Sequence, residues 1–377
     1  MTELVETLFA VCEENGASDI HLADSCAPRF RIAGALVEKG DYRPFDSKTI
    51  DAVAMELGLS TLPPGSPEGT ERVRTVLVSK GSIDGAVSSR SGARFRFNIF
   101  RESGKTAVAA RRLDGAFRSF AELGLPERLA GFCREPDGLF IVSGPTGSGK
   151  STTLATMIDK INHTRAAHIV TIEDPVEYVH KSAMSLVHQR QVGRDTRSFN
   201  DALVEALRQD PDVILVGEMR DLATVRTALR ASETGHLVFA TLHAGDAPGA
   251  IERLVSVFPP EEQSGARHQL ALSLRGIFAQ HLVPDRAGGE RHAAYELLVN
   301  TPAVANLIAT GRSAQLYSVI ETGASHGMNT LDQSLAGLLA AGLIGERDAM
   351  ALSRNPAMLK GRFEAVRRGG TEGGAAE

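Results

Sequence analysis

Gly144-Pro145-Thr146-Gly147-Ser148-Gly149-Lys150-Ser151 decides the fold of this chain, because it is a complete G-x-x-x-x-G-K-[ST] phosphate loop. An apolar, partly β-branched run at 139–143 precedes it, and apolar residues recur at helical spacing through 151–162 after it. A chance glycine-rich turn would lack these neighbours. Strand, loop and helix in this order predict a nucleotide triphosphate site in an α/β domain.

The residue types of the loop suit a polyphosphate. Glycines let successive backbone N–H groups approach phosphate oxygens without a Cβ in the way, and the start of the next helix adds partial positive charge. Lys150 is expected to reach the β- and γ-phosphates, and the Ser151 hydroxyl to hold Mg²⁺. We therefore predict that residues 144–151, together with Thr152, bind the nucleotide.

Composition narrows the class of protein. At 377 residues, with 42% hydrophobic and 23% charged residues, the chain matches an ordinary globular protein of two or three domains. A formal net charge of −5 argues against a nucleic-acid partner. Three cysteines without metal spacing indicate a reducing compartment. With no signal peptide and no run of 18 apolar residues, we expect a cytoplasmic protein with no direct membrane insertion, attached peripherally to the inner membrane through partners.

Residues 1–113 are predicted to form a small α+β domain. Strict alternation at 94–100 places phenylalanines and an isoleucine on one face of a strand, and Arg94 and Arg96 on the other. A second strand near 106–113 carries Arg111. Arginines on a shared sheet face suit an anion or the nucleotide of a neighbouring subunit, and a solvated basic face fits the same pattern equally well.

A linker is expected at 114–122, followed by an α/β domain at 123–360 and a Gly/Ala/Glu-rich tail at 361–377 that we expect to be disordered. Repeated β-then-α units predict a mostly parallel sheet with helices on both faces. Its predicted core strands are 139–143, 168–172, 213–217 and 237–243, and beyond them we expect mainly helices, including one at 260–283, with some strand character at 291–299.

Carboxylates follow two of these strands. The strand at 168–172 delivers Glu173, Asp174 and Glu177, and the strand at 213–217 delivers Glu218. A carboxylate beside a phosphate loop can orient or deprotonate the attacking water, or hold Mg²⁺ through water. A helix N-cap would explain one such residue, but two clusters after two strands favour a hydrolytic site.

Two histidines bracket the fourth core strand, His236 before it and His243 at its end. A histidine at a strand end can sense a γ-phosphate. The pattern fits a hydrogen-bonded core histidine equally well.

An ordered series of motifs resembles the secretion-type ATPases that drive type IV pili and type II secretion, and within them the pilus-retraction branch. The resemblance runs from about residue 3 to 355 and rests on Gly16 to Leu22, Ala93 to Arg96, the phosphate loop extended to Leu154, Thr171 to Glu177, Arg208 to Asp212, Gly217 to Asp221 and Thr234 to His243.

This resemblance implies ATP as the nucleotide and Glu218 as the Walker B glutamate that polarises water. Glu173, Asp174 and Glu177 match the acidic "Asp box" of the family, with the first two as metal-side residues, and His236 and His243 match its "His box". Arg94, Arg96 and Arg111 fall where the N-terminal domain supplies arginines to the nucleotide. The implied architecture is a PAS-like N-terminal domain with a RecA-like P-loop ATPase domain, in a homo-hexamer. Its implied partners are an inner-membrane pilus platform protein and a paralogous ATPase.

One stretch departs from the retraction branch, although the lack of a four-cysteine zinc insertion favours that branch. Retraction ATPases usually carry Ala-Ile-Arg-Asn-Leu-Ile-Arg-Glu, whereas this chain has Ala-Val-Ala-Asn-Leu-Ile-Ala-Thr at 303–310. Coupling to a partner is therefore expected to differ. The alternatives are an accessory nucleotide-binding ring subunit, a type II secretion or pilus assembly ATPase, a small-molecule kinase and a DNA translocase.

Overall fold

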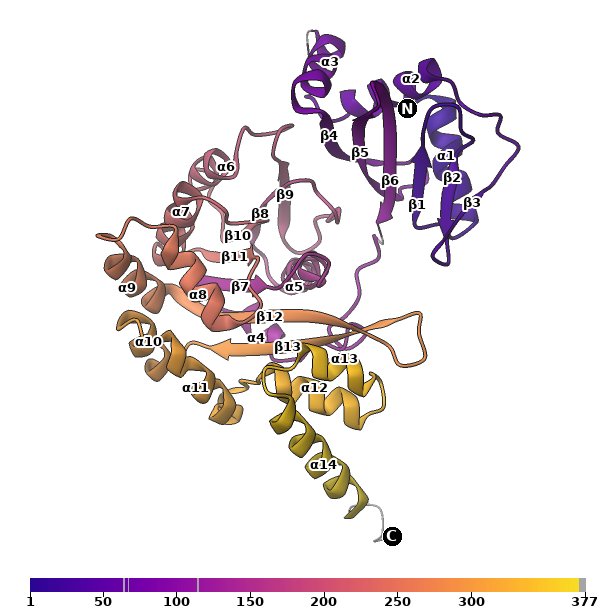
Figure 1. Ribbon diagram of the computed structural model, residues 1–377. Helices are drawn as coiled ribbons and strands as arrows, with labels where there is room; N and C mark the ends of the chain where they lie inside the picture. Colours follow the sequence, from indigo (N-terminus) through magenta and orange to yellow (C-terminus); the bar gives the residue numbers. More distant parts are fainter. Residues whose placement is uncertain (64, 67, 114, 373–377) are drawn as a thin grey trace. The chain divides into compact units, whose positions relative to one another are not determined.

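The computed structural model describes residues 1–63, 65–66, 68–113 and 115–372, and it contains two compact units (Figure 1). The N-terminal unit comprises Met1–Ala116, Glu173–His180 and Gln189–Ser198. The second, which we call the P-loop unit, comprises Phe117–Ile172, Lys181–His188 and the chain from Phe199 onward. The predicted boundary near residue 113 is close to the first break, but the two later inserts of the N-terminal unit were not expected.

The N-terminal unit is a six-stranded antiparallel sheet in the order β3-β2-β1-β6-β5-β4, with three helices. In chain order its elements are α1 (Glu3–Glu14), β1 (Asp19–Leu22), β2 (Arg29–Ile32), β3 (Ala35–Glu38), α2 (Ser47–Leu59), α3 (Gly69–Lys80), β4 (Ser82–Ser88), β5 (Arg94–Glu102) and β6 (Lys105–Leu113).

Alternation along β5 builds the core of this unit. Phe95, Phe97 and Ile99 are buried with the apolar faces of α1 and α2, and the ring of Phe95 stacks on Phe9 with 3.9 Å between centroids. Because successive side chains of a strand point to opposite faces, Arg94 and Arg96 lie on the other face of the sheet. The predicted division of β5 into an apolar and a basic face is therefore confirmed.

The P-loop unit contains a seven-stranded sheet in the order β13-β12-β7-β11-β10-β8-β9. Its strands are β7 (Gly138–Ser143), β8 (His168–Glu173), β9 (Leu186–Gln191), β10 (Val213–Val216), β11 (Leu237–Leu242), β12 (Leu274–Pro284) and β13 (Arg291–Val299). Strands β12, β7, β11, β10 and β8 pair in parallel, and β13 runs antiparallel to β12. The four predicted core strands are thus confirmed.

Helices cover both faces of this sheet (Figure 1). Its helices up to the last strand are α4 (Leu129–Phe132), α5 (Lys150–Thr164), α6 (Phe199–Ala206), α7 (Leu222–Glu233), α8 (Ala247–Ser256) and α9 (Gln263–Ser273). The buried residues of α4 and α5 share one apolar core with Phe140, Phe239 and Phe278 from the sheet, and α6, α7 and α8 pack on the other face. Strands buried on both faces explain the continuous apolar runs of the sequence.

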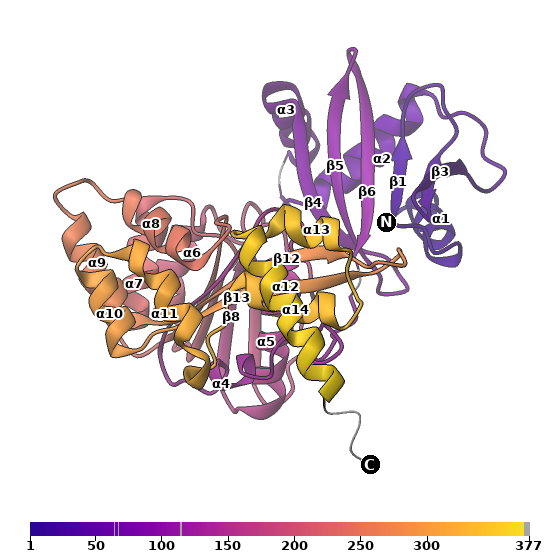
Figure 2. The same cartoon turned by 60° about the horizontal axis from the view of Figure 1, so that its bottom comes forward.

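The C-terminal helices are α10 (Pro302–Ala309), α11 (Leu316–Thr322), α12 (Leu331–Ala340), α13 (Glu346–Leu352) and α14 (Pro356–Glu372). In both ribbon views α12 and α13 lie beside β12 and β13 (Figures 1 and 2), where Leu335 and Leu339 are buried with Val283. Among the described residues, no helix combines the length and apolar character of a membrane span.

Two expectations for this region were wrong. The predicted helix at 260–283 ends at Ser273, and the apolar remainder forms β12, because it can pair with both β7 and β13. The predicted disorder at 361–377 is replaced by α14 as far as Glu372, because Leu359 and Phe363 pack into the cluster formed with α12. Residue 114 of the expected linker and residues 373–377 of the expected tail lie outside the described residues.

Candidate nucleotide site

The phosphate loop leaves β7 at Ser143 and enters α5 at Lys150. Gly144 has φ +146°, and a Cβ added there would lie 2.3 Å from the backbone oxygen of Gln280 and 2.5 Å from Ser148 Oγ. Gly149 has φ +89°, and a Cβ there would lie 2.8 Å from the Gln280 amide nitrogen. Glycine is therefore required at Gly144 by close packing against backbone and at Gly149 by its positive φ.

The groups of the loop fit a phosphate. Ser148 is buried, and among the described residues its Oγ has no hydrogen-bond partner, so the loop contains a polar group suited to a ligand. The Lys150 ammonium donates to the carbonyl oxygens of Gly144, at 2.9 Å, and Pro145, at 2.8 Å. Ser151 is exposed at the start of α5, where helix polarity favours an anion. Residues 144–152 therefore remain the predicted nucleotide-binding residues.

Glu218 lies two residues beyond the end of β10, in the same unit as the loop. Arg220 holds its carboxylate with Nε and Nη2, each 2.6 Å from a different oxygen, and His243 Nε2 lies 3.3 Å from Glu218 Oε1. Burial alone would raise the pKa of Glu218, but hydrogen bonding to Arg220 and the charges of Arg220, His243 and Lys150 hold it below its ordinary value. The structure thus brings Lys150, Glu218 and His243 together with Glu218 ionised at neutral pH.

Strand register separates the two predicted histidines. Leu242 pairs with Ser143, so His243 follows β11 where the phosphate loop follows β7. His236 precedes the other end of β11, about 20 Å from His243 along the strand at the usual rise per residue. Its Nδ1 lies 3.0 Å from the Ala231 carbonyl oxygen. Within one chain His236 is therefore not part of the loop edge, and we leave it out of the proposed site.

The predicted arginines share one face of the N-terminal sheet. Arg96 pairs in register with Arg111, and Arg94 lies two residues from Arg96 on the same strand. Arg111 Nε donates to Asp19 Oδ1 at 2.7 Å. Arg94 is held by the Val176 carbonyl oxygen at 3.1 and 3.2 Å, and its pKa is lowered mainly by burial.

The acidic segment also belongs to the N-terminal unit. Glu177 Oε1 lies 3.4 Å from Arg96 Nη1, and Glu173 Oε1 accepts from the Gln189 amide at 3.0 Å. Asp174 is exposed. Among the described residues, no three His, Cys, Asp or Glu side chains are grouped as a metal cage. Mg²⁺ sites in nucleotide enzymes use one or two carboxylates together with substrate phosphates, so such a cage is not required here.

Sequence reasoning missed Gln280 and Arg220. Gln280 is buried on β12, where its Oε1 accepts from Thr153 Oγ1 at 2.6 Å and its backbone lies under Gly144. A single glutamine within an apolar run was the available signal, but that run was interpreted as a helix. Arg220 was quoted within a motif, although nothing in the spacing indicated that it would hold Glu218.

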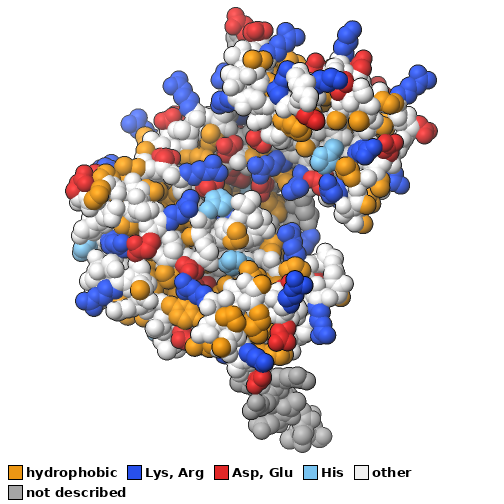
Figure 3. All heavy atoms as spheres, in the orientation of Figure 1, with side chains coloured by type: hydrophobic (Ala, Val, Ile, Leu, Met, Phe, Trp, Pro, Cys, Tyr) orange, Lys and Arg blue, Asp and Glu red, His pale blue; other side chains and the backbone are white. Residues whose placement is uncertain are grey.

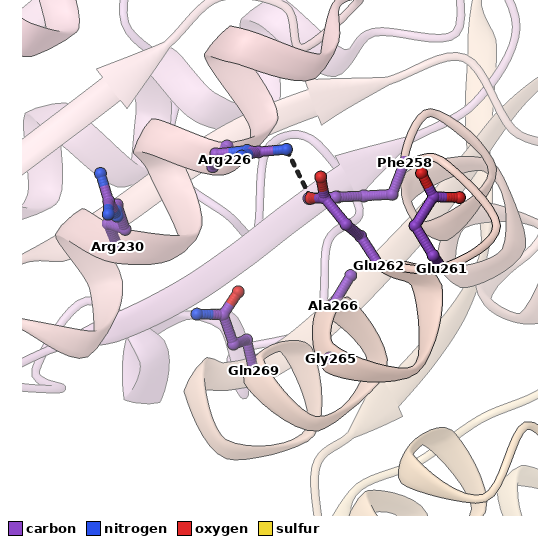
Figure 4. Close-up of a pocket in the computed structure, with 8 residues that line it drawn as sticks. All are labelled: Arg226, Arg230, Phe258, Glu261, Glu262, Gly265, Ala266 and Gln269. Carbon is purple, nitrogen blue, oxygen red and sulfur yellow. Dashed lines mark hydrogen bonds and ion pairs between the residues drawn. The ribbon is translucent and has the colours of Figure 1, made fainter.

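A separate hollow lies between α7 and α9 (Figure 4), with a cavity volume of about 380 Å³. Arg226 points across it and pairs with Glu262 at 2.5 Å. Its lining residues are Arg226, Arg230, Phe258, Glu261, Glu262, Gly265, Ala266 and Gln269. None is a predicted site residue, so the nucleotide site is assigned from the loop and not from this hollow.

Comparisons with known proteins identify the family of this chain. Residues 77–334 match the family described as "Type II/IV secretion system protein". The type IV pilus retraction ATPase PilT of Pseudomonas aeruginosa is 42% identical over 93% of this chain and 98% of its own, and the type IV pilus ATPase PilU of that species is 36% identical over 92% and 87%. A crystal structure of the pilus retraction motor PilT with bound ADP is 44% identical, with a TM-score of 0.83 over 96% of this chain and 99% of that chain. The predicted fold class is thereby confirmed.

Gly144→Ala tests the loop geometry. Because the new Cβ would meet backbone and a buried hydroxyl, the loop must shift, and we expect ADP affinity measured by calorimetry to fall by at least about tenfold, roughly 1.4 kcal/mol. Gly131→Ala is the matched control, since its Cβ meets no heavy atom within 4 Å. Unchanged affinity in a folded Gly144→Ala variant would show that the loop does not need this glycine.

Arg220→Ala tests the electrostatics of Glu218. Since Arg220 helps to lower the pKa of Glu218, its removal should raise that pKa. The acidic limb of the kcat profile should then move to higher pH, and Arg220→Lys, which keeps the charge, should shift it less. The measurement is the rate of phosphate release from about pH 4.5 to 8. If the acidic limbs of the kcat profiles coincide in wild type, Arg220→Ala and Arg220→Lys, Arg220 does not lower the pKa of Glu218.

Proposed function

Because the chain belongs to the type II/IV secretion system protein family, we propose that its nucleotide site hydrolyses ATP to power retraction of a type IV pilus. The observation that carries the catalytic part is the ionised carboxylate of Glu218, held beside Lys150 and His243. The relatives named as pilus retraction ATPases support the biological part. The chain is an ATPase of this family, and the pilus is the proposed load.

The chain's own residues supply binding and orientation. Backbone N–H groups of 146–151 are the donors offered to the phosphates. Lys150 exchanges two carbonyl partners for phosphate oxygens, which form stronger charge-assisted hydrogen bonds. Glu218 accepts hydrogen bonds from the attacking water and orients it toward the γ-phosphorus. His243 contacts the Glu218 carboxylate, so a change in the position or charge of that carboxylate acts directly on the end of β11.

A magnesium ion, when bound with ATP, neutralises developing charge on the β- and γ-phosphate oxygens. Ser151 is the hydroxyl ligand that the loop offers. Glu173 and Asp174 remain the proposed metal-side carboxylates, and Glu177 fixes their segment through its ion pair with Arg96.

The N-terminal arginines have a proposed role in a ring. Arg94, Arg96 and Arg111 present guanidinium groups on one sheet face, a suitable donor set for phosphate oxygens. We propose that this face approaches a nucleotide in a homo-hexamer, so that ring geometry controls turnover. A peripheral position at the inner membrane, beside a pilus platform protein and with a paralogous ATPase as a further partner, completes the proposal.

Glu218→Gln tests the proposed hydrolysis. The amide keeps the size of the side chain but cannot act as a carboxylate, so ATP binding should persist while kcat falls by about 10²–10⁴-fold. Glu127→Gln, an exposed carboxylate of the same unit, is the control. Phosphate release at the wild-type rate in Glu218→Gln would remove Glu218 from its role.

The second candidate is an accessory ring subunit that binds nucleotide but does not act as the motor. It is favoured by α10, where Val304, Leu307 and Ile308 are buried as a packing helix requires, while Ala305 and Ala309 replace the arginines usual in retraction ATPases. Purified chain that binds ATP but releases no phosphate would favour it over the motor.

A further inference from the structure

The connection from β11 to α8, His243–Ala247, is held by side chains from distant parts of the chain. We call it the sensor loop. His281 on β12 donates from Nε2 to the Gly245 carbonyl oxygen at 3.0 Å, and Glu296 on β13 accepts from the Ala247 backbone N–H at 2.8 Å. Because these two strands are paired with each other, they hold the loop from one rigid edge of the sheet.

A third hold comes from the connection between α13 and α14. There the guanidinium of Arg354 donates to a carboxylate oxygen of Asp246, the N-cap of α8, and lies over the Tyr317 ring at 5.1 Å from its centroid. The backbone N–H of Arg354 donates to Asp332 Oδ1 at 3.1 Å, and Asp332 is only 1% exposed. Arg354 is therefore fixed at its backbone and at its side chain.

The ion pair between Arg354 and Asp246 is not needed to cap α8. Asp246 Oδ1 already caps α8 by accepting from the Gly249 N–H at 2.6 Å, so Arg354 is not required for the cap. The three holds share the sensor loop, whose first residue, His243, lies 3.3 Å from the Glu218 carboxylate. A displacement of about 1 Å at a reacting group can cost about 10²-fold in rate, so the position of this loop matters for hydrolysis.

We propose that Arg354, Glu296 and His281 are positioning residues for ATP hydrolysis, which clamp the sensor loop so that His243 meets Glu218. The clamp makes Arg354, between two C-terminal helices, part of the apparatus that positions the catalytic residues. The inference rests on the proposed roles of Glu218 and His243.

The protonation of Glu296 bears on the clamp. Glu296 is 1% exposed, and among the described residues its Oε2 has no partner. Burial raises its pKa to about 7; the Ala247 N–H and Arg354 lower it, and Asp246 and Asp332 raise it. The pKa of Glu296 in the folded state is above the ordinary value of 4.5, so the folded state binds this proton more tightly than the unfolded state does. The stability that the protonated side chain contributes is therefore complete below about pH 4.5 and is lost as pH rises through about 7.

Kinetics of the full-length protein test the clamp. Arg354→Ala should lower kcat by about tenfold, because the loop is loosened, and leave the KM for ATP within about twofold, because the phosphate loop is untouched. Arg354→Lys should recover part of the rate, and Arg347→Ala, an exposed arginine on α13, should match wild type. An unchanged kcat in Arg354→Ala overturns the proposal. So does a rise in the KM for ATP as large as the fall in kcat.

Glu296→Gln supplies a second test that does not depend on removing an ion pair. Glutamine keeps the acceptor for the Ala247 N–H and imitates the protonated acid, so kcat at pH 7 should be retained. The thermal midpoint of wild type should fall relative to Glu296→Gln between about pH 5 and pH 8. Loss of activity in a folded Glu296→Gln variant contradicts the clamp, and parallel midpoint curves contradict the raised pKa of Glu296.

The two levels of inference can fail separately. Wild-type hydrolysis in Glu218→Gln removes the proposed function and the basis of the clamp with it. Loss of hydrolysis in Glu218→Gln together with normal kcat in Arg354→Ala removes the clamp alone.

Discussion

The parallel pairing of β11 between β7 and β10 is the constraint on which the rest of this structure depends. Ser143 lies opposite Leu242, and Val216 lies opposite Ala240, so three strands end at one edge of the sheet. The phosphate loop, His243 and Glu218 come directly after these strand ends and therefore meet at that edge. A shift of one residue in either pairing would turn buried side chains to the opposite face of the sheet. Core packing and site geometry are therefore specified together.

Electrostatics at this edge serve both stability and chemistry. Lys150 donates to loop carbonyls, and Glu218 is held by a guanidinium and a histidine. Each charged group has a protein partner, which limits the cost of holding charges partly buried. A triphosphate would add its negative charge where the backbone N–H groups of the loop and Lys150 meet. Charges of both signs are interspersed over the face of the molecule shown in Figure 3, so this arrangement is local and not the result of a basic surface.

The sequence predicted those parts of the fold and site whose physics is local. The phosphate loop, the four core strands and the arginine face of β5 follow from spacing, because backbone conformation and two-residue alternation leave a direct trace in the residues. It failed where partners are distant. The residues of β12 were predicted to continue the helix at 260–283, and pairing with β7 and β13 makes them a strand instead. His236 was grouped with His243 because both match the family's "His box", and the length of β11 places them at opposite ends of that strand. Gln280, Arg220 and Arg354 acquire their roles only from residues brought together by folding.

The central claim is that Lys150 and Glu218 act on the same γ-phosphate. A structure of the full-length chain with Mg²⁺ and a non-hydrolysable ATP analogue tests it most directly. We expect Lys150 Nζ to leave the carbonyl oxygens of Gly144 and Pro145 for phosphate oxygens, with the Glu218 carboxylate facing the γ-phosphate across one water. A triphosphate bound while Lys150 keeps both carbonyl partners, or with Glu218 turned away from the γ-phosphate, would contradict the claim.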